Sequence, residues 1–329
     1  MSIKVISGHA IFNENMLVLS KKFNWILEKD FNPQPNDLYI VFGAHELAYP
    51  LLELQIRKNM SFGYVIFNSE QPNSQFFKNK YYIQLMKKNI VFDYNTISAN
   101  YLDLHFNIKV LSYFYFEFMK FTLDVPRVYD VAFIGSRSDK RAEILQQLQL
   151  DYPDLKFYID YNWSHGSAES LTQILHQCKI VLNIPYYDNN PLETHRIHKA
   201  LACGCQVVSL YSNESDANEF YKDYVYMTDR ITLEERPPLK SYEELVSVLA
   251  RKFNPHMNFM LEHIHKKLLS ISNEVSQPAT VDLHSNDEKE EVVLGEQVWK
   301  RLPLCEMDSA RLVCKVYDTY IRAKTAYEK

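Results

Sequence analysis

Short runs of β-branched and aromatic residues alternate with stretches of helical periodicity along most of this 329-residue chain. Such alternation is typical of βα units, whose strands form a mostly parallel sheet. In the first half the pattern predicts strands at residues 3–7, 38–42, 64–68, 90–93 and 109–112. It predicts helices near 15–29, 45–59, 74–88 and 95–105. We therefore expect the first half to form one α/β domain.

The pattern starts again after a break at 113–128, which contains the aromatic run YFYFEF. Further strands are predicted at 130–134, 155–159, 179–184, 206–210 and 224–227. Further helices are predicted near 138–150, 167–177, 193–203, 214–222, 241–253 and 256–271. We therefore predict two α/β domains, at 1–120 and 121–271. Because open parallel sheets bind ligands beyond the carboxyl ends of their strands, we expect the site in a cleft between the domains.

The C-terminal part of the chain has a different character. Residues 272–300 are mostly polar, include an acidic run and lack periodicity, which predicts a flexible linker. Residues 301–329 follow with an apolar helical stripe at about 308–326. This stripe predicts a C-terminal helix that docks on another surface.

Composition narrows the function. The 36 Lys and Arg residues against 41 Asp and Glu residues leave a formal charge of −5, so we expect no nucleic-acid partner. The 7 glycines are scattered, which excludes both the dinucleotide-binding G-x-G-x-x-G motif and the P-loop. Any phosphate must then be held by side chains and a helix N-terminus.

Cysteine usage and hydropathy bear on the compartment. The 5 cysteines form no C-x-x-C pair, which indicates reduced thiols. The N-terminal apolar run is too short and broken for a signal peptide, and no apolar stretch is long enough to span a membrane. We therefore expect a cytoplasmic protein or one on the cytoplasmic side of a membrane. Peripheral membrane contact through the lysines of 78–88 stays open beside the commoner explanation, a solvated helix face.

The first segment that suggests chemistry is VAFIGSRSDKRAEIL, residues 131–145. It contains Gly135, Ser136, Arg137, Lys140 and Arg141. An apolar strand here leads through a polar turn into a helix that Ser136 or Ser138 can cap. The free N–H groups of the helix start and the three cations favour a phosphate ligand. The alternative is a solvated basic first turn.

The second segment is IVLNIPYYDNNPLETHRIHKALACGCQVVSL, residues 180–210. It contains Asn183, Asn190, Glu193 and Arg196. A buried strand leads to a polar loop, then to a helix that begins near Pro191 and ends at Gly204. Glu193 is thereby expected at the carboxyl edge of the sheet, where a carboxylate can accept hydrogen bonds from sugar hydroxyls. The alternative is a local helical ion pair between Glu193 and Arg196.

These segments, in this order, resemble the donor half of GT-B glycosyltransferases, and most closely the small bacterial and viral "group 1" type. The first half agrees, because YVIFNSEQP at 64–72 and IVFDYNTISANYL at 90–102 resemble that group's N-domain motifs. The similarity spans about residues 38–230. It implies two Rossmann-like domains that face a central cleft, followed here by the linker and the C-terminal helix.

The resemblance also implies an activity, namely transfer of a sugar from a nucleotide-sugar donor to a glycan or other hydroxyl acceptor. Arg137 and Lys140 or Arg141 match the diphosphate-binding turn, and Glu193 and Arg196 match the E-x-x-R pair of the donor site. The matches in the N-domain are residues expected to line the cleft, namely Glu70, Gln71, Asp93 and Asn100. The chain has no D-x-D pair, so we expect neither a metal nor another cofactor.

Three positions depart from the family pattern. Pro185 replaces a usual His, Lys199 stands where many relatives have a second Glu, and Leu210 replaces a Glu. Lys199 is expected to alter donor choice or to weaken donor binding. The departures keep two rival hypotheses open: a non-catalytic nucleotide-sugar-binding protein and a nucleotide-sugar epimerase.

The N-domain offers three candidates for a catalytic group. His45 follows the strand at 38–42 and is expected to face the cleft, where an imidazole can take a proton from an acceptor hydroxyl. Glu70 and Asp93 follow or end the next two strands. The alternatives are that His45 only packs or caps a helix, and that Asp93 only caps the helix after it.

Overall fold

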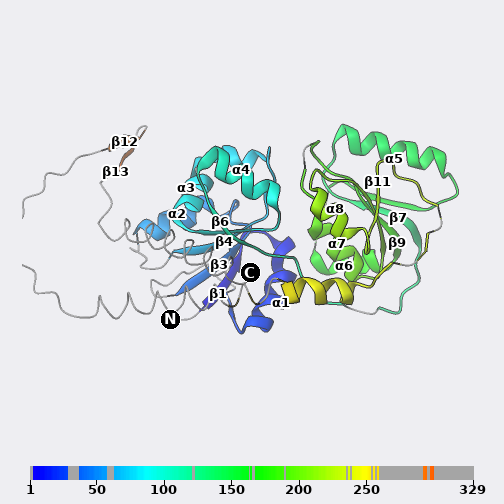
Figure 1. Ribbon diagram of the computed structural model, residues 1–329, viewed down its shortest axis with the longest axis horizontal. Helices are drawn as coiled ribbons and strands as arrows, with labels where there is room; N and C mark the ends of the chain where they lie inside the picture. Colours follow the sequence, from blue (N-terminus) through cyan, green and yellow to red (C-terminus); the bar gives the residue numbers. More distant parts are fainter. Residues whose placement is uncertain are drawn as a thin grey trace, which may run out of the picture.

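The computed structural model describes residues 3–28, 37–57, 63–120, 123–162, 164, 167–188, 190–234, 236–237 and 239–252. It also describes residues 255 and 258 and the backbone of 292–294 and 297–299. The described residues form two α/β lobes, which lie side by side in Figure 1. Each lobe is built on one parallel sheet.

The N-terminal lobe has a six-stranded sheet in the order β2-β1-β3-β4-β5-β6. Its strands are β1 (Ile3–Ser7), β2 (Ile26–Leu27), β3 (Leu38–Phe42), β4 (Tyr64–Asn68), β5 (Ile90–Asp93) and β6 (Val110–Tyr113). Its helices are η1 (Ala10–Phe12), α1 (Asn13–Phe23), α2 (Ala48–Arg57), η2 (Gln75–Lys78), α3 (Lys80–Lys88) and α4 (Thr96–Phe106). Every residue of β3 and β4 is buried, which explains their unbroken apolar runs.

One N-terminal prediction was wrong. The helix expected near 15–29 ends at Phe23, because Asn24 adopts the left-handed conformation, with φ at 55°, and closes α1. Asparagine tolerates this region better than most residues. The chain then forms β2, which pairs with β1 at the edge of the sheet.

The C-terminal lobe has a five-stranded sheet in the order β11-β10-β9-β7-β8. Its strands are β7 (Tyr129–Ile134), β8 (Phe157–Asp160), β9 (Cys178–Asn183), β10 (Gln206–Leu210) and β11 (Tyr226–Thr228). Its helices are α5 (Asp139–Asp151), α6 (Ala168–His176), α7 (Thr194–Ala202), α8 (Ser215–Tyr221) and a helix over residues 242–252. Gly204, with φ at 72°, follows the end of α7 as predicted.

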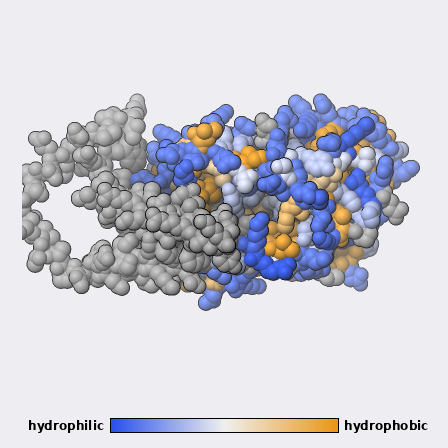
Figure 2. All heavy atoms as spheres, viewed as in Figure 1, coloured by the Kyte–Doolittle hydropathy of each residue, from blue (hydrophilic) through white to orange (hydrophobic). Residues whose placement is uncertain are grey.

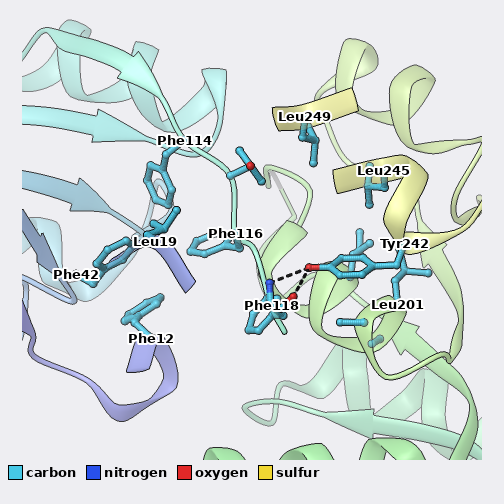
Figure 3. Close-up of a cluster of buried hydrophobic side chains, with 14 of the residues drawn as sticks. Phe12, Leu19, Phe42, Phe114, Phe116, Phe118, Leu201, Tyr242, Leu245 and Leu249 are labelled. Carbon is cyan, nitrogen blue, oxygen red and sulfur yellow. Dashed lines mark hydrogen bonds between the residues drawn. The ribbon is translucent and has the colours of Figure 1, made fainter. Parts of the chain in front are cut away.

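The aromatic run at 113–118 lies between the lobes, as Figure 3 shows. Phe114, Phe116 and Phe118 are each at most 4% exposed. They belong to one apolar cluster that includes Phe12 and Phe42 of the N-terminal lobe, and from the other lobe Leu201, Tyr242, Leu245 and Leu249. These aromatics therefore pack the junction between the two lobes.

Polar contacts hold the same junction. The hydroxyl of Tyr242 accepts a hydrogen bond from the Phe118 N–H at 2.8 Å. The ring of His198 lies between the carbonyl of Phe116 and the hydroxyl of Tyr221. Helix 242–252, yellow in Figure 1, lies next to residues 113–119, which we call the crossing segment because they pass from one lobe to the other.

The remaining predictions on the C-terminal part fall largely outside the described residues. The helices predicted at 256–271 and 308–326 lie there almost entirely. Two short strands, β12 (Val292–Leu294) and β13 (Gln297–Trp299), pair antiparallel within the segment predicted as a linker. The domain limits themselves stay a prediction.

The surface gives no broad apolar face in the view of Figure 2, where hydrophilic residues cover most of the coloured atoms and hydrophobic ones form small groups. No helix among the described residues is long and apolar enough to cross a membrane. Peripheral membrane contact stays a prediction.

Candidate functional site

A cavity of about 290 Å³ lies between the lobes and brings together four of the predicted site residues. His45 and Glu70 line it from the N-terminal lobe, and Glu193 and Arg196 line it from the C-terminal lobe. We call it the inter-lobe cavity. A neighbouring cavity of about 500 Å³ shares His45 and adds Ser136. His45 and Glu193, which are far apart in sequence, thus line the same cavity. This agrees with the expectation that the site lies between the domains, beyond the carboxyl ends of the strands.

Local backbone geometry explains how His45 reaches this position. Strand β3 ends at Phe42, and Gly43 follows with φ at 60°, a conformation that glycine adopts without strain. A Cβ atom at Gly43 would lie 3.1 Å from the backbone nitrogen of His9. The tight turn places His45 directly beyond the strand, where its ring packs on Phe76 with centroids 4.2 Å apart.

His45 and Glu70 form a close pair. Nδ1 of His45 lies 3.1 Å from Oε1 of Glu70, and the Ser74 hydroxyl donates to Oε2 of the same carboxylate at 2.7 Å. Burial, with a smaller effect of His9, lowers the pKa of His45 to about 4. Burial raises the pKa of Glu70 to about 6. Near pH 7 this leaves a neutral imidazole beside a carboxylate, so a ring nitrogen is free to accept a proton, although the lowered pKa makes the ring a weaker base than an ordinary histidine.

Asp93 takes a different place from the one expected. It is fully buried and does not line the inter-lobe cavity. Its carboxylate accepts hydrogen bonds from Asn68 Nδ2 at 2.7 Å and from the N–H of Asn95 at 3.1 Å. Burial raises its pKa well above the usual range. Because Asn68 Oδ1 in turn accepts from the Glu70 N–H, Asp93 positions Glu70 and does not reach a substrate itself.

The helix-capping alternative for Asp93 is also wrong. Asn95 is the N-cap of α4, and its side chain accepts a hydrogen bond from the N–H of Ser98 at 2.7 Å. Asn100, also expected to line the cleft, is exposed on α4, whereas Gln71 lines the inter-lobe cavity.

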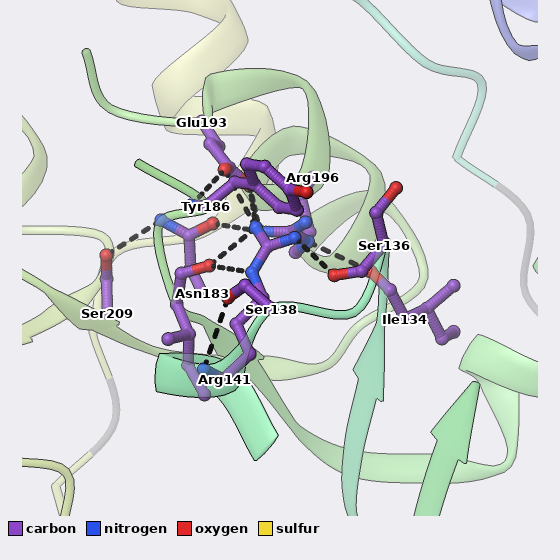
Figure 4. Close-up of polar contacts among 10 residues, drawn as sticks. Ile134, Ser136, Ser138, Arg141, Asn183, Tyr186, Glu193, Arg196 and Ser209 are labelled. Carbon is purple, nitrogen blue, oxygen red and sulfur yellow. Dashed lines mark hydrogen bonds and ion pairs between the residues drawn. The ribbon is translucent and has the colours of Figure 1, made fainter. Parts of the chain in front are cut away.

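On the donor side, Arg141 is enclosed by its own lobe (Figure 4). Its side chain is 2% exposed and donates to the Ile184 and Ser136 carbonyls and to Glu193 Oε1 at 2.9 Å. Burial lowers the pKa of Arg141 to about 10. The sequence placed Arg141 among the diphosphate-binding cations, but the structure commits its donors to the loop that carries Glu193.

Glu193 lies between two arginines. Its carboxylate accepts from Arg141, from the Tyr186 N–H at 3.3 Å, and from Arg196, with which it also forms the predicted helical ion pair. Because Arg141 contacts both oxygens, the carboxylate has four contacts in all, which is about the number of acceptor positions that a carboxylate offers. Sugar hydroxyls that bind here must therefore displace or share one of these donors.

Arg196 is anchored at the end of the sheet. Its Nε donates to the Ile134 carbonyl at 3.2 Å and its Nη1 to Asn183 Oδ1 at 2.8 Å. Asn183 itself donates to the Ser209 hydroxyl at 2.9 Å. A Cβ atom at Gly135 would lie 2.7 Å from Arg196 Nη2, so any larger residue there would make the guanidinium shift from this position. Gly135 thus leaves space for the Arg196 guanidinium beside the backbone.

The other residues of the basic turn face outward. Arg137 is exposed, and Lys140 forms an ion pair of 2.9 Å with Asp188. Ser138, rather than Ser136, caps α5 by accepting from the Arg141 N–H. Lys140 and Asn190 line another cavity, of about 370 Å³, which shares no lining residue with the inter-lobe cavity.

Two more residues of the cavity are Lys199, which the sequence analysis expected to affect donor binding, and His195, for which it predicted no role. Lys199 lines both spaces between the lobes and pairs with Glu14 of α1. His195 lines the same spaces. Its Nε2 is buried without a hydrogen-bond partner among the described residues, and burial lowers its pKa to about 3. The sequence did contain a signal that His195 lies at the site, because it stands between Glu193 and Arg196.

Metal ligands were searched for as well. Within the described ranges, no three His, Cys, Asp or Glu side chains are grouped so that they could hold a metal ion. Metal independence stays a prediction.

Comparison with known proteins adds little. No family model matches the chain, and no curated protein matches its sequence significantly. Among solved structures, it is similar to Anabaena Alr3699/HepE in complex with UDP, at 10% identity and a TM-score of 0.40, over 99% of this chain and 100% of that one. It is also similar to the GtfA/B complex, at 10% identity and a TM-score of 0.33, over 87% and 58% of the two chains. At these values neither structure adds to the argument from the residues.

Proposed function

We propose that the protein is a metal-independent glycosyltransferase that moves a sugar from a nucleotide-sugar donor to a hydroxyl acceptor. One observation carries the proposal: the His45–Glu70 pair of one lobe and the Glu193–Arg196 pair of the other line a single cavity. Such a space offers a proton acceptor on one wall and a sugar-binding carboxylate beside a cation on the other. The order of sequence motifs that resembles the GT-B family supports the same function.

In this mechanism His45 is the general base. It takes the proton of the acceptor hydroxyl while the acceptor oxygen bonds to the anomeric carbon and the bond from that carbon to the diphosphate oxygen breaks. The Glu70 carboxylate, 3.1 Å from Nδ1 but outside hydrogen-bond geometry, would stabilise the imidazolium that forms by its charge. Arg196, which lines the cavity, would neutralise the charge that develops on the departing nucleoside diphosphate.

The enclosure of Glu193 favours a second candidate, a non-catalytic protein that binds nucleotide sugars. Its carboxylate is already held by Arg141, Arg196 and the Tyr186 N–H. If these contacts persist when a donor is bound, the sugar cannot use Glu193. Binding without transfer would follow.

The decisive experiment mixes the full chain with UDP-, GDP- and ADP-sugars and a panel of hydroxyl acceptors, and follows nucleoside diphosphate release. We expect release that depends on the acceptor, and a loss of about 10²- to 10⁴-fold in turnover in His45→Gln with donor affinity kept. His105→Gln is the matched control, since it makes the same replacement at an exposed histidine of α4.

The other outcomes separate the rivals. Donor binding with no release across the panel would identify the non-catalytic protein. Conversion of the nucleotide sugar without any acceptor would identify an epimerase. Absence of both binding and release would refute the assignment to nucleotide sugars.

A further inference from the structure

His195 has no part in the mechanism proposed above, although it lines both spaces between the lobes. Its Nε2 is buried and has no hydrogen-bond partner among the residues that the structure describes. Buried polar atoms are nearly always hydrogen-bonded. An unpaired ring nitrogen in the wall of a cavity therefore calls for a partner that enters the cavity.

Three phenylalanine rings surround His195. The centroids of Phe116 and Phe118, in the crossing segment, lie 4.7 and 4.9 Å from that of the imidazole. Phe12 of the N-terminal lobe lies 5.6 Å away. All three rings meet the imidazole nearly at right angles, an arrangement that aromatic pairs prefer. They hold the ring in place, and their side chains carry no polar atom that could pair with Nε2.

The imidazole of His195 is uncharged near pH 7. Burial, followed by the charge of Lys199, lowers its pKa to about 3, and a backbone hydrogen bond with Ile11 acts in the opposite direction. A neutral imidazole has one N–H and one lone pair, so it can bond a hydroxyl group. It offers no positive charge to a phosphate.

Two residues of the opposite wall also have an unpaired polar atom. They are Ser69 and Gln71, which follow β4 and line the inter-lobe cavity. Ser69 Oγ and Gln71 Oε1 are buried without a partner among the described residues. A hydroxyl, an amide oxygen and an imidazole nitrogen are all neutral, and they come from both lobes.

The cations of the same walls are engaged with carboxylates. Arg196 pairs with Glu193, and Lys199 pairs with Glu14. The groups left to bind a ligand are therefore neutral, which suits a neutral ring that carries several hydroxyl groups. The cavity of about 290 Å³ is at the small end of the range of about 300–1,000 Å³ that is usual for small-molecule sites. That size suits one sugar ring.

We propose that His195 is a specificity-determining residue of the inter-lobe cavity, where its Nε2 forms a hydrogen bond with one hydroxyl group of a bound sugar ring. Ser69 and Gln71 bind further hydroxyl groups from the other lobe. The inference rests on the proposed function, because it takes the ring to be one of the two sugars of that reaction. Two sources have this chemistry: the sugar of the nucleotide-sugar donor, and a sugar that serves as acceptor.

The test compares the full-length wild type with His195→Phe by calorimetry. The probes are the UDP-, GDP- and ADP-conjugates of glucose, galactose and mannose, the methyl glycosides of the same sugars, and analogues that each lack one ring hydroxyl. We expect His195→Phe to weaken the binding of at least one probe by about tenfold. The analogue that lacks the hydroxyl bonded by His195 should bind both proteins equally, because the bond is absent from both.

Two further variants sharpen the comparison. His195→Gln should keep part of the affinity, because its amide can still bond a hydroxyl group. His176→Phe is the matched control, since His176 on α6 is 5% exposed and its Nε2 is also unpaired among the described residues, but it lines neither space between the lobes. It should leave the binding of every probe unchanged, and an equal loss in His176→Phe and His195→Phe would overturn the proposal.

Thermal unfolding without ligand separates recognition from a structural role. His195→Phe loses the bond with Ile11 and removes an unpaired nitrogen, so we expect these effects to offset each other and the Tm to stay nearly unchanged. A large fall in Tm together with an equal loss of affinity for every probe and analogue would mean that the ring only holds the lobes together. That result would overturn the proposal.

The pattern of losses identifies the source of the sugar. A loss confined to the nucleotide sugars identifies the donor, and a loss confined to the methyl glycosides identifies the acceptor. Equal binding of every probe by wild type and His195→Phe would overturn this inference alone and leave the proposed function standing. If no probe binds the wild type at millimolar concentration, the inference and the proposed function are both refuted.

Discussion

The ammonium group of Lys199 on α7 pairs with the carboxylate of Glu14 on α1, and this contact joins the two lobes through a buried ion pair. Lys199 is 4% exposed and Glu14 is 9% exposed. The other oxygen of Glu14 accepts from the Met119 N–H at 3.0 Å, at the end of the crossing segment. The family departure at Lys199 thus has a structural partner 185 positions away in sequence.

We expect Lys199→Met to destabilise the protein strongly, because it leaves the Glu14 carboxylate buried without its cation. Breaking a buried pair in this way costs about 3–5 kcal/mol. The double variant Glu14→Met with Lys199→Met should recover most of that loss, since no charge is then left unpaired. Thermal unfolding measures both free energies.

Lys222→Met is the control. It removes an exposed pair with Glu219 and should change stability by about 0–1 kcal/mol. Equal effects of Lys199→Met and Lys222→Met would contradict this account.

A second contact between the lobes is a helix cap. Oε1 of Glu214 accepts from both the N–H and the hydroxyl of Thr96, each at 2.9 Å, at the first residue of α4. Glu214→Ala should cost about 1 kcal/mol, as the loss of an N-cap does. Hydrogen exchange should speed up in the first turn of α4. Glu219→Ala, at an exposed position of the following helix α8, should not alter that exchange. If the two variants give the same exchange pattern, the cap does not stabilise α4.

Stability should fall in acid through His198. Burial lowers the pKa of His198 to about 4, below its ordinary 6.5. The unfolded chain therefore takes up a proton first as the pH falls. The contribution of this histidine is complete above about pH 6.5 and is lost progressively down to about pH 4, by roughly 3 kcal/mol. Thermal unfolding across this range measures the slope.

His198→Gln should flatten that slope by about one proton, while His45 and His195 keep part of it, because burial lowers their pKa values as well. His105→Gln changes an exposed histidine and should keep the full slope. A pH profile that is the same in both variants would show that His198 does not titrate on unfolding.

Gly135→Ala should weaken nucleotide-sugar binding with little change in Tm. The new Cβ would lie 2.7 Å from Arg196 Nη2, so the guanidinium must shift away from Ile134 and Asn183. Displacement of one charge-assisted bond corresponds to about tenfold in affinity or more. Arg196→Gln should give a similar loss, and the double variant no further loss, because both act on one group. If titration shows that the two losses of affinity add in the double variant, Gly135 does not act through Arg196 and the prediction is wrong.

Five strands were predicted with the bounds that the structure has: β1, β3, β4, β5 and β10. For β3 and β4 the reason is that a parallel strand covered on both faces is apolar over nearly its whole length, and that pattern needs no knowledge of its neighbours. The boundary between α1 and β2 was not predictable in the same way. It depends on one asparagine in a left-handed conformation and on pairing with β1.

The sequence by itself determined the two α/β lobes, the placement of His45 and Glu70 just beyond strand ends, and that of Glu193 at the start of a helix facing the carboxyl edge of the second sheet, because periodicity and chain direction are local properties. Only the tertiary structure decided how the charged residues pair. Arg141 holds Glu193, Lys199 holds Glu14, and Asp93 supports Glu70 through Asn68. A buried charge must find a partner wherever packing brings one, and that partner is set by how the sheets and lobes meet rather than by distance along the chain.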